Sequence, residues 1–94
     1  MLAKVLKNEG LLKSINGVNF VHKILKKGEK IEKHNHPGKE IVFAVMKGSF
    51  TITIADTEEH TVLAGEVLNF DGANTISAVA NEDSESLVVL VDNK

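Results

Sequence analysis

The chain has no cysteine, arginine, tryptophan or tyrosine, and one proline in 94 residues. Without cysteine it cannot form a disulfide, a zinc–thiolate site or a thiol nucleophile. Without arginine it has no guanidinium group for bidentate recognition of phosphate or guanine. Only four phenylalanines remain for stacking on bases. We therefore expect no nucleic-acid partner.

Long hydrophobic runs are also missing. No run approaches the roughly 20 apolar residues that cross a bilayer, and the N-terminus lacks the apolar region of a signal peptide. We therefore expect no membrane partner and a cytoplasmic location. The length predicts a single domain over residues 1–94. A domain this small buries only about two thirds of its unfolded surface, which favours a homodimer.

Charge is divided unevenly along the chain. Residues 1–50 hold ten lysines and four acidic residues, whereas residues 51–94 hold one lysine and nine acidic residues. Each half repels itself, and the two halves attract each other when their strands lie together. A basic surface for nucleic acid is the alternative explanation, and the missing arginine and aromatic residues disfavour it.

From Val18 onward, short segments rich in β-branched and apolar residues alternate with glycine-containing turns. Phe50, Ile52 and Ile54 alternate with threonines, the period of two that turns one strand face toward a core. The other predicted strands are Val18–Leu25, Glu40–Met46, Thr61–Leu63, Val67–Phe70, Ile76–Ala80 and Leu87–Val91. This spacing predicts an all-β, antiparallel barrel of the jelly-roll type over residues 18–91. Residues 1–17 are predicted to form an edge strand or a short helix.

Two histidines are spaced to share one strand face. His34 and His36 are two residues apart, so both imidazoles project from the same side of an extended strand. Pro37-Gly38 then turns the chain, and Glu40 opens the next strand. Two imidazoles and a carboxylate form a facial triad that suits Fe, Mn, Ni or Zn. The alternative is a polar loop that holds no metal.

The other two histidines carry weaker signals. His22 shares a strand face with Phe20 and Ile24, which predicts that it points into the barrel or lines its mouth. An interior histidine satisfied by hydrogen bonds is the commoner case, and a substitute metal ligand is the alternative. His60 follows an acidic hairpin tip and is predicted to be a solvated surface residue.

Residues 28–48 resemble the first conserved motif of the cupins. That motif is a glycine, five residues, His-x-His, three or four residues, a glutamate, six residues and a glycine, and Gly28, the two histidines and Glu40 match its start. The gap from Glu40 to Gly48 is seven residues, so Ile41 stands where a four-residue gap would put the glutamate. A one-residue slip reverses the face to which a strand residue points, unless a bulge absorbs it.

The second cupin motif is recognisable but eroded. Its opening glycine matches Gly65, and Asp71-Gly72-Ala73 stands in place of its Pro-x-Gly. Its histidine falls on Ile76 when counted from Gly65, or on Ser77 when counted back from Asn81. The resemblance therefore implies the cupin barrel, with His34, His36 and Glu40 as metal ligands and no histidine from the second motif.

Three functions remain open at this point, and no catalytic residue is assigned. The first is binding of a small molecule inside the barrel, with a weak or vestigial divalent-metal site. The second is a metal-dependent enzyme of the dioxygenase or isomerase kind. The third is a non-catalytic structural or interaction module with a filled barrel. Further candidate site or cavity residues are His22, Ser77, Phe43, Phe50 and Phe70.

Overall fold

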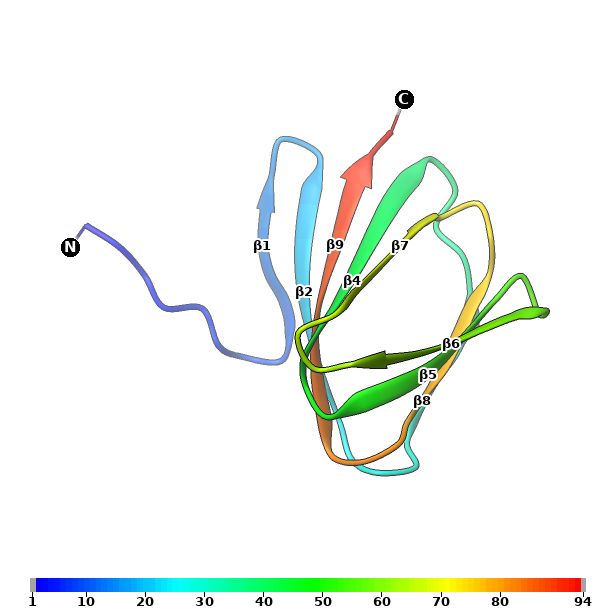
Figure 1. Ribbon diagram of the computed structural model, residues 1–94. Helices are drawn as coiled ribbons and strands as arrows, with labels where there is room; N and C mark the ends of the chain where they lie inside the picture. The colour runs from blue at the N-terminus through cyan, green and yellow to red at the C-terminus, as the bar shows by residue number, and fades with distance from the viewer. Residues whose placement is uncertain (1, 94) are drawn as a thin grey trace.

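The computed structural model describes residues 2–93 and shows nine strands in this range (Figure 1). The strands are β1 (Gly10–Ile15), β2 (Val18–Leu25), β3 (Lys30–His34), β4 (Lys39–Lys47), β5 (Ser49–Ile54), β6 (Glu58–Leu63), β7 (Val67–Asp71), β8 (Ile76–Ala80) and β9 (Ser84–Asp92). Residues 2–93 contain no helix that could span a membrane. Met1 and Lys94, which belong to the predicted domain 1–94, lie outside the described residues.

The strands form two antiparallel sheets. The five-stranded sheet has the order β1-β2-β9-β4-β7, and the four-stranded sheet has the order β3-β8-β5-β6. The predicted all-β jelly roll is thereby confirmed. Strand β1 forms the outer edge of the five-stranded sheet, in the segment for which the sequence left an edge strand or a helix open.

The mixed strand order brings the two halves of the chain together. Strand β9 lies between β2 and β4, so a strand of the acidic half has two strands of the lysine-rich half as neighbours. Lys39 pairs with Asp92, and Lys33 pairs with Asp56. Opposite charges of the two halves therefore meet in the folded chain, as the charge division predicts.

The hydrophobic core lies between the two sheets. Phe50, Ile52 and Ile54 are buried, in agreement with the alternation seen in the sequence. Phe50 contacts Phe43 of the opposite sheet edge-to-face, with ring centroids 5.2 Å apart. Aromatic pairs favour this arrangement. The core therefore sets the separation of the two sheets, and the candidate site lies between these sheets.

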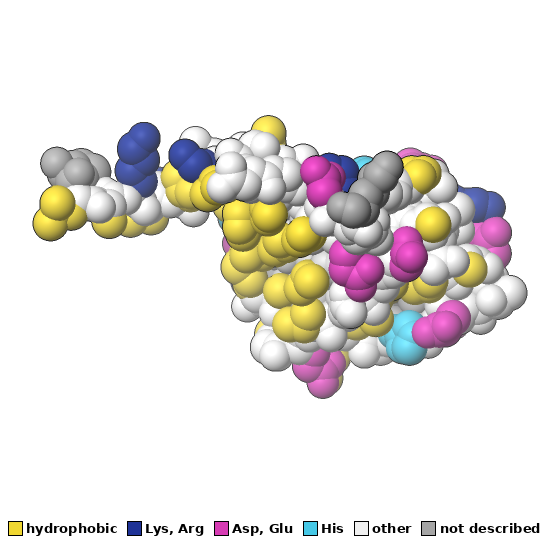
Figure 2. All heavy atoms as spheres, turned by 90° about the horizontal axis from the view of Figure 1, so that it is seen from above, with side chains coloured by type: hydrophobic (Ala, Val, Ile, Leu, Met, Phe, Trp, Pro, Cys, Tyr) yellow, Lys and Arg dark blue, Asp and Glu magenta, His cyan; other side chains and the backbone are white. Residues whose placement is uncertain are grey.

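The N-terminal segment lies outside this core. Residues 2–9 extend away from the barrel, and their side chains are exposed (Figures 1 and 2). Leu2 and Val5 are among the most exposed hydrophobic residues of the chain. Figure 2 shows further hydrophobic side chains on the part of the barrel next to this segment.

Candidate functional site

A cavity of about 190 Å³ lies between the two sheets. Its lining residues are Val21, Lys23, Ile31, His34, His36, Ile41, Phe43, Phe70, Ile76, Val88 and Leu90. Among the described residues, the only polar side chains in this lining are those of Lys23, His34 and His36. Lys23, Ile31 and His34 also line a groove beside the cavity, so the cavity has basic side chains at its mouth.

A β-bulge in β3 directs His34 toward the cavity. Ile31 pairs with Ala78 and His34 pairs with Ile76, so two residues of β3 lie opposite the single residue Ser77. The extra residue changes the alternation of faces. Ile31 and His34 therefore both line the cavity although they are three residues apart.

The bulge also fixes the tautomer of His34. Its Nδ1 lies 2.7 Å from the carbonyl oxygen of Glu32. A carbonyl oxygen only accepts hydrogen bonds, so Nδ1 carries a proton and donates it to Glu32. The Nε2 atom is then the ring nitrogen left to contact a ligand.

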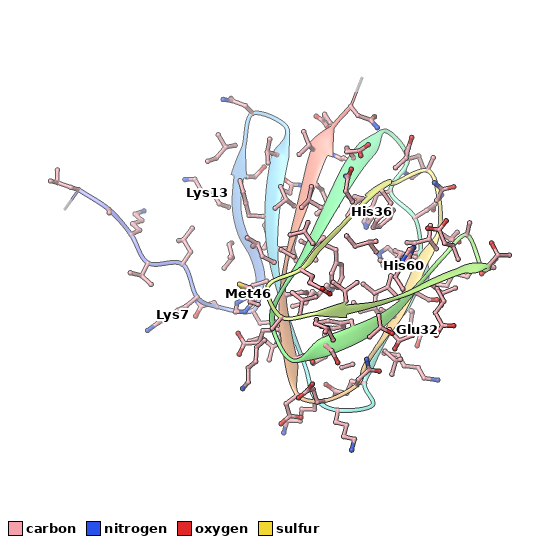
Figure 3. All side chains as sticks on the ribbon, viewed as in Figure 1. Lys7, Lys13, Glu32, His36, Met46 and His60 are labelled. Carbon is pink, nitrogen blue, oxygen red and sulfur yellow. The ribbon has the colours of Figure 1, made fainter. Side chains whose placement is uncertain are left out.

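His36 is held by its backbone between two loops. Its N–H donates to the carbonyl of Gly72 at 2.7 Å, and the N–H of Gly72 donates to the carbonyl of Lys39 at 2.8 Å. A Cβ atom at Gly72 would lie 2.4 Å from the carbonyl oxygen of His36, so only glycine fits. His36 lies between the two sheets (Figure 3), with its ring edge-on to that of His34 at a centroid distance of 4.8 Å.

The electrostatic environment of His36 is positive. Burial lowers the pKa of its imidazole below 6.5, and the charges of His34, Lys39 and Lys23 lower this pKa further. Desolvation and neighbouring positive charges both disfavour the imidazolium form. His36 is therefore predominantly neutral at pH 7 in a field that favours an anion.

Glu40 does not join the two histidines, contrary to the predicted triad. Its Oε2 accepts a hydrogen bond from Nδ2 of Asn69 at 2.8 Å, on the outer face of the five-stranded sheet. The neighbouring Ile41 lines the cavity and is 2% exposed. The gap between Glu40 and Gly48 is one residue longer than in the motif. Because neighbouring strand residues point to opposite faces, Ile41 points inward and Glu40 points outward.

The structure also decides between the two countings of the second motif. Ile76 is buried and lines the cavity opposite His34. Ser77 pairs with Thr53 and points to the outer face of the four-stranded sheet, away from the cavity. The count from Gly65 is therefore correct, and the count from Asn81, which made Ser77 a candidate site residue, is wrong.

These two replacements decide whether a metal fits. Isoleucine stands at both cavity positions where the motifs carry a glutamate and a histidine. Within residues 2–93 no three His, Cys, Asp or Glu side chains lie close enough together to hold a metal ion. Catalytic zinc sites use three protein ligands, and a carbon side chain cannot supply one. The residues present therefore do not fit the usual cupin metal.

The remaining predicted residues divide into three groups. Phe43 and Phe70 line the cavity as expected, whereas Phe50 is fully buried in the core beside it. His22 is buried and its Nε2 lies 3.1 Å from Glu85 Oε1, so it has the polar contact expected of an interior histidine. It lies on the outer face of β2, however, so the prediction that it points into the barrel is wrong. His60 is 40% exposed and contacts Glu58, which agrees with a partly solvated position.

Lys23 was missed as a site residue because the other face of β2 is the more apolar one. The face with Phe20, His22 and Ile24 was therefore expected to point inward, but the cavity takes Val21 and Lys23 from the opposite face. A lysine between the apolar residues Val21 and Leu25 was the signal available in the sequence.

Comparison with known proteins agrees with this architecture. A family model described as "Cupin domain" matches residues 21–91. No curated protein sequence matches the chain. A conserved Streptococcus pyogenes protein of unknown function shares 25% identity at a TM-score of 0.77, over 89% of this chain and 72% of that one.

Two further solved structures are similar to the chain. KdgF from Halomonas sp. is 18% identical at a TM-score of 0.79, over 89% of this chain and 76% of its own. A predicted oxalate decarboxylase from Thermotoga maritima is 21% identical at a TM-score of 0.75, over 83% and 70% respectively. At these sequence identities the similarity shows a common fold alone.

Proposed function

The chain belongs to the cupin domain family, and we propose that it binds a small, largely apolar molecule inside the barrel without a divalent metal ion. The cavity is the observation that carries the proposal. Its volume of about 190 Å³ exceeds the ~150 Å³ that suffices for one benzene ring in an apolar cavity. Small-molecule sites are typically apolar with a few polar groups that fix orientation, and this lining has that composition.

A metal-dependent enzyme is the second candidate, and one observation favours it. The hydrogen bond from His34 Nδ1 to Glu32 leaves Nε2 free, the arrangement common in histidines that bind metals. The similar structure of a predicted oxalate decarboxylase keeps this candidate open, although it resembles the chain in fold only. Two imidazoles without a third ligand form a weak site, so metal-free binding is the better supported function.

A filled barrel with a structural or interaction role is the third possibility. The apolar cavity disfavours it, because protein interiors are otherwise packed at nearly crystalline density. A cavity that persists in solution and takes up a ligand separates the first function from the third.

The test uses protein purified without a nickel column and treated with EDTA. Methyl NMR spectra are recorded during titration with benzyl alcohol, a neutral probe of benzene size. We expect saturable shifts in the methyl groups of Val21, Ile41 and Val88, which line the cavity. The variant Ile31→Phe fills the cavity mouth and should weaken binding, whereas Val79→Phe, on the outer face of the four-stranded sheet, should not.

Two results would contradict the proposal. Unchanged cavity methyl signals at saturating benzyl alcohol would favour the filled module. Stoichiometric Fe, Mn, Ni or Zn in the purified protein, with probe binding that disappears after EDTA treatment, would favour the metal-dependent function.

A further inference from the structure

We propose that the cavity selects a small carboxylic acid, whose apolar body fills the barrel while its carboxylate meets Lys23, His34 and His36 at the mouth. This inference rests on the proposed function and adds the chemical class of the ligand. The carboxylate would lie among these three side chains, and no metal ion would be needed to bind it.

The composition of the lining is the first argument. Eight of the eleven lining residues are apolar, and the other three are a lysine and two histidines. The lysine ammonium only donates. The neutral His36 offers one ring N–H, whereas His34, whose Nδ1–H donates to the carbonyl of Glu32, donates from Nε2 only when it takes up a second proton with the bound carboxylate. Acids, amides and hydroxyl groups are absent from the lining within the described residues. Hydrogen bonds from a cation to a carboxylate are stronger than those between neutral groups.

The position of Lys23 is the second argument. Its side chain belongs to the inward face of β2, between Val21 and the buried Leu25. The side chain is partly buried between the cavity and the groove, so a bound anion would compensate the hydration that the ammonium group loses there. The four ion pairs found within residues 2–93 do not include Lys23, His34 or His36. A bound carboxylate would supply the missing partner.

The acidic residues nearest to Lys23 do not supply it. Glu9, Glu29 and Glu32 line the groove outside the cavity, and all three are exposed. The carboxylate of Glu29 accepts a hydrogen bond from the backbone N–H of Lys26 at 2.7 Å. The position from which an inward glutamate would repel the ligand is occupied by Ile41. The interior therefore lacks a like charge that would oppose a carboxylate.

The experiment compares three probes of equal size and different charge on EDTA-treated protein at pH 7.5. Benzoate carries the proposed group, benzyl alcohol is neutral and benzylamine is cationic. Because a hydrogen bond to a charged group contributes more than one between neutral groups, we expect benzoate to bind about 10-fold or more tighter than benzyl alcohol. Benzylamine should bind most weakly, since it meets only basic groups.

The variant Lys23→Met keeps an unbranched side chain, one atom shorter, and removes its charge. It should lower the affinity for benzoate about 10-fold and that for benzyl alcohol much less, so that the preference for benzoate is lost. Lys13→Met is the matched control, because it makes the same change of net charge at an exposed position of β1 (Figure 3). Thermal unfolding of both variants shows whether the fold is retained.

The outcomes separate this inference from the proposed function. Equal affinities for benzoate and benzyl alcohol, with no effect of Lys23→Met, would overturn the carboxylate selectivity and leave small-molecule binding intact. Equal losses in Lys23→Met and Lys13→Met would also overturn it, because net charge alone would then explain the preference. Failure of all three probes to shift the cavity methyl groups would overturn both.

Discussion

His34 lies directly opposite Ile76 across the pairing of β3 with β8. The second cupin motif has a histidine at this position, and Ile41 replaces the glutamate of the first motif in the same cavity. Two hydrocarbon side chains therefore stand beside two imidazoles that remain in place. This local substitution converts a potential coordination sphere into an apolar pocket with a basic mouth.

The double variant Ile41→Glu/Ile76→His should recreate a metal site. Both new side chains would face His34 and His36, and the ligand number would rise from two to four. We expect the affinity for Ni²⁺ or Zn²⁺ to increase by about 100-fold or more, measured by isothermal titration calorimetry. The control Ser77→His adds a histidine on the outer face and should give no gain. A gain in the control alone would mean that β8 faces the other way.

Gly72→Ala should destabilise the protein and displace His36. The added Cβ would lie 2.4 Å from the carbonyl oxygen of His36 and 2.8 Å from that of Lys39. We expect the free energy of unfolding in urea to fall by about 1–3 kcal/mol, as for other overpacking changes, and the imidazole signals of His36 to shift. Ala73→Ser, in the exposed part of the same turn, is the control. Equal stability of the two variants would contradict the close approach at Gly72.

The imidazole of His36 should titrate below pH 6.5 in an NMR experiment, because burial and the charges of His34, Lys39 and Lys23 lower its pKa. Lys23→Met should raise this pKa toward 6.5 by removing one charge, while Lys13→Met should not change it. Because the pKa of His36 is lower in the folded chain than in the unfolded chain, the unfolded chain binds a proton more readily. At pH values above the pKa of the unfolded chain this difference has no effect on stability. The stability falls as the pH drops from 6.5 to the folded pKa. A pKa at or above 6.5 would contradict this account of the cavity mouth.

We propose that a second copy of the chain covers the outer face of the five-stranded sheet. Phe20, Val89 and Val42 form one cross-strand row on this face, and each is only partly buried. Val89→Lys at the centre of the row should reduce the molar mass measured by light scattering from twice that of the chain to that of one chain. Val79→Lys, on the outer face of the other sheet, should leave the dimer intact. A wild-type protein of single-chain mass would contradict the proposal.

The strands could be predicted well where apolar residues mark them. The predicted segments Val18–Leu25 and Ile76–Ala80 coincide with β2 and β8. Strand β9 begins three residues earlier than predicted, at Ser84, because Ser84 and Ser86 are buried polar residues that composition assigns to a turn. Strand β3 consists mostly of charged residues and was not among the predicted strands; the sequence indicated an extended segment there only through the spacing of His34 and His36. The strand ends at His34, and His36 lies in the loop that follows it.

The facing of side chains was harder to predict than the strands. On β2 the more apolar face, which carries His22, points outward, so alternation favoured the wrong face. On β4 both faces are largely apolar, so alternation could not show whether Glu40 or Ile41 pointed inward. The bulge in β3 depends on pairing with β8, a contact between residues more than 40 positions apart in the sequence. The two histidines were therefore found from their spacing, whereas the partners across the cavity required the fold.

The length of the loop between β3 and β4 has a wider consequence for this barrel. Inserting one residue between His36 and Glu40 would place Glu40 at the position of Ile41. It would turn Glu40, Val42 and Ala44 toward the interior and Ile41 and Phe43 toward solvent. Because apolar side chains occur on both faces of β4, the lengthened chain could still form a core. An insertion, without any exchange of amino acids, would then bring an acid to the imidazoles, so loop length alone can separate a metal-binding barrel from a metal-free one.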